Sequence, residues 1–212
     1  MIYIIGMGPG NIDYMTSISI EKLKKAEILI GGRRHIDMIS IRFFEMDNKE
    51  KFYITTDLEN MKNYILENKE KNIAVLASGD PSLYGIGDYI YRNLKDRVDI
   101  EVIPGISSVQ YCFSRFNLNM NDVYITSSHG RELDYDFLFM HDKISMVTDK
   151  KVGPYEISNE IEKRGLDYDV YVGENLSYEN EILSFGSHKK FLEKRDYCMC
   201  VIILIKSRNL ST

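Results

Sequence analysis

The chain has 212 residues, of which 44% are hydrophobic and 28% charged, as in an ordinary globular protein. Its formal net charge of -5 gives no bulk attraction for nucleic acid or an anionic membrane. The longest continuous apolar run, residues 198–205, is too short to span a bilayer, and the N-terminus carries no secretion-like signal. We therefore expect a cytoplasmic protein with one large domain or two small ones.

Cysteine and histidine spacing does not match a metal or redox motif. Cys198 and Cys200 are two residues apart, unlike a C-x-x-C pair, and the third cysteine is distant in sequence. The four histidines are spread along the chain at positions 35, 129, 141 and 188. Buried apolar cysteines and unconnected surface histidines are favoured over a metal site, so we predict that protein ligands bind no metal.

Short apolar runs alternate with segments of helical period in the first half. Strands are predicted at 2–5, 27–31, 51–55, 72–77 and 98–103, and helices at 17–26, from Arg34, and at 57–69, 84–95 and 106–115. This alternation is typical of a parallel sheet with helices on both sides.

The polar stretch RFNLNMND, residues 115–122, is the best candidate linker. After it, strands are predicted at 123–127, 143–148 and 168–173 and within NEILSFG and YCMCVIILI, with helices at 133–140, 154–164 and near Ser187. The closely spaced strands near the end indicate an antiparallel or mixed sheet. We therefore expect two α/β domains, 1–115 and 116–212, with a cleft between them.

The first strand runs into a glycine-rich turn, IYIIGMGPGN, which raises the question of a dinucleotide site. Such a site needs G-x-G-x-x-G and an acid after the second strand. Here the third fingerprint position is Asn11, Pro9 removes one backbone donor, and the second strand ends in GGRRH. The pattern disfavours a dinucleotide site. A tight turn that binds no ligand remains the alternative interpretation.

Ligands of α/β sheets bind outside the carboxyl ends of the strands, so the loops there are the candidate site. In SGDPSLYGIG, Gly79 allows close approach of the backbone and Asp80 offers a carboxylate, although Asp80 and Pro81 also fit a helix N-terminus. The serines of PGISS fit a helix cap, and the histidine and arginine of SSHGRE fit solvated side chains equally well. The acids of VTDKKVGP and GENLSYENE fit caps or side chains that face water.

Taken in order, the loops GMGPGN, ASGDPSLYG, VIPGISS, TSSHGR, VTDKKVGP and VGENLSYENE resemble those of the tetrapyrrole methylases. The resemblance implies two α/β domains, S-adenosylmethionine as cofactor, a homodimer, and a first loop near the substrate cleft. GGRRH, SGDPSLYGIG and TSSHGR resemble most the members that methylate C5 of cobalt-precorrin-7 in anaerobic cobalamin synthesis. The chain has no room for the fused decarboxylating domain of aerobic relatives, so a separate decarboxylating methyltransferase is expected in the pathway.

The resemblance also implies site residues. Those for the cofactor are Pro9, Ser78, Gly79, Asp80, Leu83, Ser107, Ser108, Val147, Thr148, Asn175 and Leu176, and those for the substrate are Gly8, Gly10, Arg33, Arg34, His129 and Arg131. Arginines beside the cleft suit a substrate rich in carboxylates, although each is equally consistent with a solvated charge. His129 is the candidate for moving a proton, since imidazole titrates near neutrality.

Two other functions fit parts of this pattern. A relative acting on a different precorrin, a protein side chain or ribosomal RNA would share the cofactor loops, but an RNA enzyme should carry a basic patch that the acidic balance does not favour. A degenerate cofactor-sensing scaffold is disfavoured by the intact GDP and GMGPG motifs.

Overall fold

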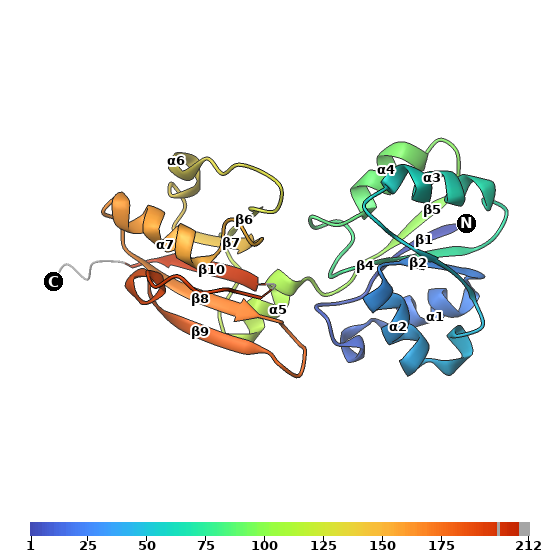
Figure 1. Ribbon diagram of the computed structural model, residues 1–212, viewed down its shortest axis with the longest axis horizontal. Helices are drawn as coiled ribbons and strands as arrows, with labels where there is room; N and C mark the ends of the chain where they lie inside the picture. The colour runs from blue at the N-terminus through green and yellow to red at the C-terminus, as the bar shows by residue number, and fades with distance from the viewer. Residues whose placement is uncertain (199, 208–212) are drawn as a thin grey trace. The chain divides into compact units, whose positions relative to one another are not determined.

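The computed structural model describes residues 1–198 and 200–207 and separates into two compact units (Figure 1). The first unit is Met1–Ser107 and the second begins at Ser108. The sequence predicts a boundary after residue 115, whereas the contacts of helix α5, Ser108–Arg115, group this helix with the second unit. Each unit is described by itself below.

The first unit is built on a five-stranded parallel sheet, as predicted. Its order is β3-β2-β4-β1-β5, and its strands are β1 Ile2–Gly6, β2 Ile28–Gly31, β3 Glu50–Tyr53, β4 Ile73–Ala77 and β5 Ile100–Ile103. The register pairs Ile4 with Val75 on one side and with Val102 on the other. The loops that follow β4, β1 and β5 therefore leave the same edge of the sheet side by side.

Helices cover both faces of this sheet (Figure 1). Alternate residues of β1 point to opposite sides: Tyr3 and Ile5 belong to one buried cluster, and Ile2 and Ile4 to another. The first cluster includes residues of α1, Ser17–Lys25, and α2, Arg33–Arg42, and the second includes residues of α3, Leu58–Glu67, and α4, Gly87–Leu94. Two short 3-10 helices, η1 Ile12–Tyr14 and η2 Phe44–Met46, were not predicted.

The second unit has a mixed sheet of order β6-β7-β10-β8-β9, which confirms that prediction. The strands are β6 Tyr124–Ser127, β7 Lys143–Val147, β8 Tyr168–Glu174, β9 Ile182–Ser187 and β10 Cys200–Lys206. β6 and β7 are parallel, and the other neighbours are antiparallel. The ends of β6, β7 and β8 carry the three loops singled out in the sequence.

One buried cluster fills the face of this sheet that α7, Pro154–Lys163, covers. It joins Ile157 and Ile161 of α7 to the strand residues Ile144, Val170 and Ile202, and includes Leu138 of the short helix α6, Tyr135–Leu138, and Phe191 of η3, His188–Phe191. Helix α5 contacts β10 and β7. Helices therefore pack against the second sheet as well.

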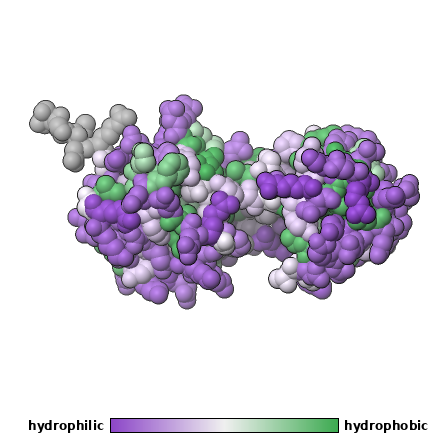
Figure 2. Space-filling model, turned by 90° about the horizontal axis from the view of Figure 1, so that it is seen from above, coloured by the Kyte–Doolittle hydropathy of each residue, from purple (hydrophilic) through white to green (hydrophobic). Residues whose placement is uncertain are grey.

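Polar residues dominate the visible face of each unit, with apolar residues scattered among them (Figure 2). Among exposed apolar side chains, Ile41 and Phe44 are 85% and 82% accessible. None of the helices in the described part of the chain has the length and apolar character needed to cross a membrane.

Candidate functional site

The loops after β1 and β4 are joined through backbone alone. Gly8 N–H donates to the Gly79 carbonyl at 3.2 Å, and Gly79 N–H donates to the Gly8 carbonyl at 2.9 Å. Both residues have positive φ, 80° and 64°, a conformation that L side chains rarely adopt. Glycine at these two positions therefore fixes two candidate ligand loops against each other.

A third loop, after β5, packs against the same point. A Cβ added to Gly105 would lie 2.3 Å from the Gly79 carbonyl oxygen and 2.9 Å from Gly6 Cα, and one added to Gly6 would lie 2.5 Å from Gly105 N. Only hydrogen fits in these gaps. Three strand-end loops thus meet at backbone contact distance.

Asp80 connects two of these loops through its side chain. One carboxylate oxygen accepts from Gly105 N–H at 3.0 Å, and the other accepts from Ser82 N–H at 2.8 Å and from the Ser82 hydroxyl. The capping interpretation of Asp80 is too narrow, because its carboxylate also reaches the loop after β5. Helix α4 begins only at Gly87, so Asp80 caps a turn rather than that helix.

The glycine-rich loop does not run directly into a helix N-terminus. The 3-10 helix η1 follows it, and α1 begins at Ser17 behind its own N-cap, Thr16, whose side chain accepts from Ser19 N–H at 3.2 Å. A phosphate cradle depends on free N–H groups of the helix that the loop enters. This geometry agrees with the sequence argument against a dinucleotide site.

The remaining cofactor candidates of the first unit differ in accessibility. Pro9 and Ser107 are buried, Ser78 is exposed, and Leu83 is half-buried, with its N–H donating to the Asp80 carbonyl at 3.2 Å. Gly10 has a φ of 157° and is half-buried. Ser78 therefore offers a polar side chain to solvent beside the glycine contacts.

The arginines of GGRRH lie at the start of α2. Arg33 and Arg34 are exposed, and the Arg33 guanidinium lies 4.6 Å from the centre of the Tyr53 ring. Arg34 lies 3.3 Å from the Nε2 atom of His35. Burial, with a smaller effect from Arg34, lowers the pKa of His35 to about 4, so this imidazole is uncharged at neutral pH. Neither His35 nor Tyr53 is among the site residues predicted from the sequence.

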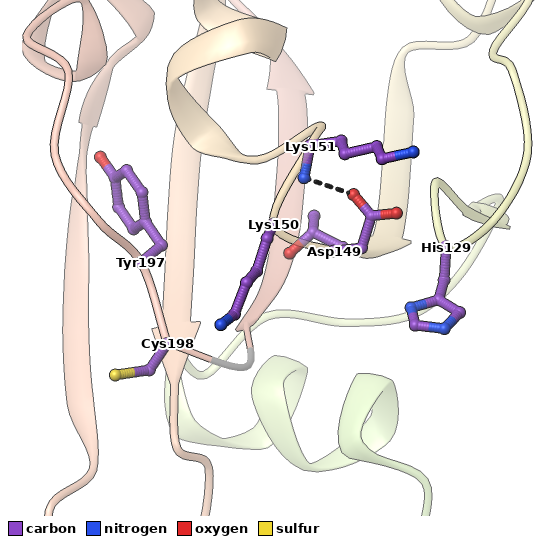
Figure 3. Close-up of a pocket in the computed structure, with 7 residues that line it drawn as sticks. His129, Asp149, Lys150, Lys151, Tyr197 and Cys198 are labelled. Carbon is purple, nitrogen blue, oxygen red and sulfur yellow. Dashed lines mark hydrogen bonds between the residues drawn. The ribbon is translucent and has the colours of Figure 1, made fainter. Parts of the chain in front are cut away.

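In the second unit, the loops after β6 and β7 border a cavity of about 470 Å³. Figure 3 shows it, and its lining residues are His129, Thr148, Asp149, Lys150, Lys151, Tyr197 and Cys198. His129 and Thr148 are the two predicted site residues that the structure brings together here. Arg131 is exposed, and it is not among the lining residues.

Asp149 organises the loop after β7 (Figure 3). Its carboxylate accepts from the N–H groups of Lys151 at 2.8 Å, Val152 at 2.9 Å and Gly130 at 3.4 Å, so it also ties in the loop after β6. These bonds, led by that from Val152, hold the pKa of Asp149 below its usual range. Asp149 is thus a structural acid, as the sequence analysis expected of acids in these loops.

Thr148 is buried, and its hydroxyl lies 3.0 Å from the Cys200 carbonyl and 2.7 Å from the Cys200 sulfur. Val147, the last residue of β7, is half-buried. Among the candidates after β8, Asn175 has a φ of 47° and Leu176 is 4% exposed against Gly173.

Glu174, an acid that the sequence predicts to cap a loop or face water, is instead buried at the end of β8 and forms an ion pair. Glu174 is 1% exposed, accepts from the Arg195 guanidinium at 2.5 Å and 3.2 Å, and also accepts from Cys198 N–H at 3.0 Å. Arg195 in turn lies 3.7 Å from the centre of the Tyr197 ring. The pair fixes the segment that supplies Tyr197 and Cys198 to the cavity. Partners 21 residues apart left no local pattern in the sequence.

Within residues 1–198 and 200–207, no group of three or more His, Cys, Asp or Glu side chains is placed to hold a metal ion.

Comparison with known proteins identifies relatives over nearly the whole chain. The family model for tetrapyrrole (corrin/porphyrin) methylases matches residues 1–190. A Salmonella typhimurium protein named cobalt-precorrin-7 C(5)-methyltransferase is 39% identical over 98% of this chain and 100% of its own length. A Methanocaldococcus jannaschii protein named probable cobalt-precorrin-7 C(5)-methyltransferase is 31% identical over 90% of each chain.

Solved structures share the fold. A precorrin-6Y methylase from Archaeoglobus fulgidus superposes with a TM-score of 0.73 at 22% identity, covering 98% of each chain. A uroporphyrin-III C-methyltransferase from Thermus thermophilus, solved with S-adenosylhomocysteine, superposes with a TM-score of 0.75 at 20% identity, covering 96% of each chain. Both confirm the α/β fold class expected from the sequence.

Proposed function

Because the chain belongs to the tetrapyrrole (corrin/porphyrin) methylases, we propose that it methylates C5 of cobalt-precorrin-7 with S-adenosylmethionine as the methyl donor. The observation that carries this proposal is the 39% identity to the Salmonella typhimurium relative across that protein's full length. We further propose a cytoplasmic homodimer that works beside a separate decarboxylating methyltransferase.

The glycine contacts of the first unit suit a cofactor that must come close to backbone. Gly8 and Gly79 hold their loops together through main-chain hydrogen bonds, and the neighbouring Ser78 is exposed and able to hydrogen-bond. Asp80 would hold these loops in position through its bonds to Gly105 and Ser82, rather than act only as a direct ligand. The residues present therefore fit S-adenosylmethionine.

In the second unit, the proposed cofactor contacts come from the ends of β7 and β8. Thr148 lines the cavity with its hydroxyl held against Cys200, and Leu176 is an apolar side chain that packs against Gly173. An apolar wall with a few fixed polar groups is typical of small-molecule sites.

S-adenosylmethionine, when bound, would supply a methyl group activated by its sulfonium, and transfer to the C5 carbon would break the carbon–sulfur bond and release S-adenosylhomocysteine. The residues of the chain then have to bind and orient the two reactants and accept a proton from the substrate. Holding the reactants in line lowers the activation free energy by roughly 7–11 kcal/mol. His129, exposed at the cavity of the second unit, is the proposed group for accepting a proton released from the substrate.

We assign Gly8, Gly10 and the three arginines 33, 34 and 131 to the substrate side. The side chains of Arg33 and Arg34 are exposed at the start of α2, where a guanidinium can bind a carboxylate with two parallel hydrogen bonds. Cobalt belongs to the substrate in this scheme.

The test is isothermal titration of the full-length protein with S-adenosylhomocysteine, beside Asp80→Ala and the control Asp88→Ala on α4. Asp88 pairs only with Arg92 on the surface among the contacts described. We expect the wild type and the control to bind alike, and Asp80→Ala to bind at least about tenfold more weakly because its loops lose charge-assisted bonds. A folded wild type that fails to bind would contradict the proposal, and methyl transfer to cobalt-precorrin-7 would complete it.

A further inference from the structure

The cavity in the second unit carries two lysines that the proposed function has not used. Lys150 and Lys151 both line it, and both residues are exposed (Figure 3). We propose that these two ammonium groups form a subsite for the peripheral carboxylates of the corrinoid substrate. The inference rests on the proposed function and adds the residues that would select an acidic macrocycle.

The acid next to these lysines in the chain, Asp149, already has hydrogen-bond partners. In residues 1–198 and 200–207, neither the Lys150 nor the Lys151 ammonium group forms an ion pair or hydrogen bond. The adjacent Asp149 carboxylate is turned to the backbone, where it accepts from three N–H groups. The positive charges at the cavity are thus left for a ligand, although the protein is acidic as a whole.

The other lining groups fit an acidic ring edge. His129 adds a third nitrogen-bearing side chain, and the Tyr197 ring adds an apolar surface. The Arg195 guanidinium, itself paired with Glu174, lies 3.7 Å from the centre of the Tyr197 ring, so this ring has a fixed partner before a ligand arrives. A cavity of about 470 Å³ is of ordinary ligand-site size, which suits one edge of a macrocycle with its acidic side chains.

A carboxylate could reach these lysines from two sources, the macrocycle or the methionine end of the cofactor. The macrocycle is favoured because two separate ammonium groups suit several carboxylates, whereas the cofactor carries one, beside its own positively charged amine. The two sources are separated by measuring both ligands on the same variant.

The experiment uses the full chain with Lys150→Gln and Lys151→Gln combined. Its matched control combines Lys163→Gln and Lys189→Gln, two exposed lysines outside the cavity that lose the same charge. Three probes are titrated into each protein: cobyrinic acid, which carries free carboxylates on a corrin ring, its heptamethyl ester, which has none, and S-adenosylhomocysteine.

We expect the cavity variant to bind cobyrinic acid at least tenfold more weakly than the control, and to bind the ester and S-adenosylhomocysteine unchanged. The subsite proposal would be overturned, with the proposed function left standing, if both variants bound cobyrinic acid with equal affinity. The same holds if the wild type bound S-adenosylhomocysteine but not cobyrinic acid. Loss of S-adenosylhomocysteine affinity instead would assign the lysines to the cofactor and also overturn it. Failure of the wild type to bind S-adenosylhomocysteine would count against the proposed function instead.

Discussion

Glu174 and Arg195 form an ion pair in which the acid is almost fully buried and the guanidinium is half exposed. The Glu174 side chain is 2% accessible, and that of Arg195 is 44% accessible. Since a buried carboxylate without a partner is costly, the acid depends on the arginine more than the arginine depends on the acid.

Replacing Arg195 with methionine should therefore lower the free energy of unfolding by about 1.5–3 kcal/mol, the range for hydrogen bonds to a charged group. The exposed pair of Arg92 and Asp88 supplies the control, because Arg92→Met should cost less than about 1 kcal/mol. Urea unfolding followed by circular dichroism measures both. Equal midpoints for the two variants would mean that Glu174 is satisfied without Arg195.

Adding a methyl group at Gly105 should disturb the meeting point of three loops. The new Cβ would lie 2.3 Å from the Gly79 carbonyl oxygen, and backbone atoms cannot move aside as a flexible side chain can. We expect Gly105→Ala to cost about 1–3 kcal/mol of stability and to weaken S-adenosylhomocysteine binding. Gly32→Ala is the control, since nothing lies within 4 Å of its Cβ position. Thermal unfolding and titration calorimetry report both effects, and indifference at both positions would show that the loops can separate.

Asp149 should make stability depend on acid. Its pKa is lower in the folded protein than the ordinary value of 3.8, so its stabilising contribution is complete above 3.8 and is lost as pH falls through the folded pKa. Asp149→Asn should be less stable than the wild type at pH 7, and the difference should shrink below pH 3.8. Urea midpoints measured across that range test this. A difference that stays constant with pH would assign the loss to packing rather than to charge.

The three cysteines should differ sharply in reactivity. Burial raises the pKa values of Cys112 and Cys200 to about 12, so at pH 8 both remain protonated and covered. Cys198 is exposed and lines the cavity of the second unit. A thiol-disulfide reagent should label one thiol quickly in the native protein, and Cys198→Ser should remove that fast phase. Cobyrinic acid should slow the labelling of Cys198 in the wild type. Three equal rates would contradict the burial of the other two.

Much of the fold could be predicted because its signals are local. The alternation of apolar runs and helical periods placed the strands of both sheets within a few residues, as for β4, predicted at 72–77 and observed at Ile73–Ala77. Helix α5 was found, but nothing in its sequence says that it contacts β7 and β10. Assignment to a unit depends on contacts far along the chain.

The candidate site was less readable for the same reason. The glycine-rich loops that contain Gly8 and Gly79 could be recognised in the sequence. The pair of backbone hydrogen bonds between these glycines could not, because it joins residues in separate loops. The bond from Asp80 to Gly105 and the pairing of Glu174 with Arg195 also have no local spacing rule. The proposed ligand roles of these loops remain predictions until binding is measured.

The two reciprocal hydrogen bonds between Gly8 and Gly79 use only main-chain atoms. The spacing of the loops therefore does not depend on the side chains that would contact a ligand. Side chains that project from neighbouring positions, such as the exposed Ser78, can be exchanged without breaking the bond that sets the loops' spacing. A protein built in this way can change the ligand contacts of its loops by point substitution while its framework stays intact, which makes these loops a suitable starting place for engineering the use of altered methyl donors.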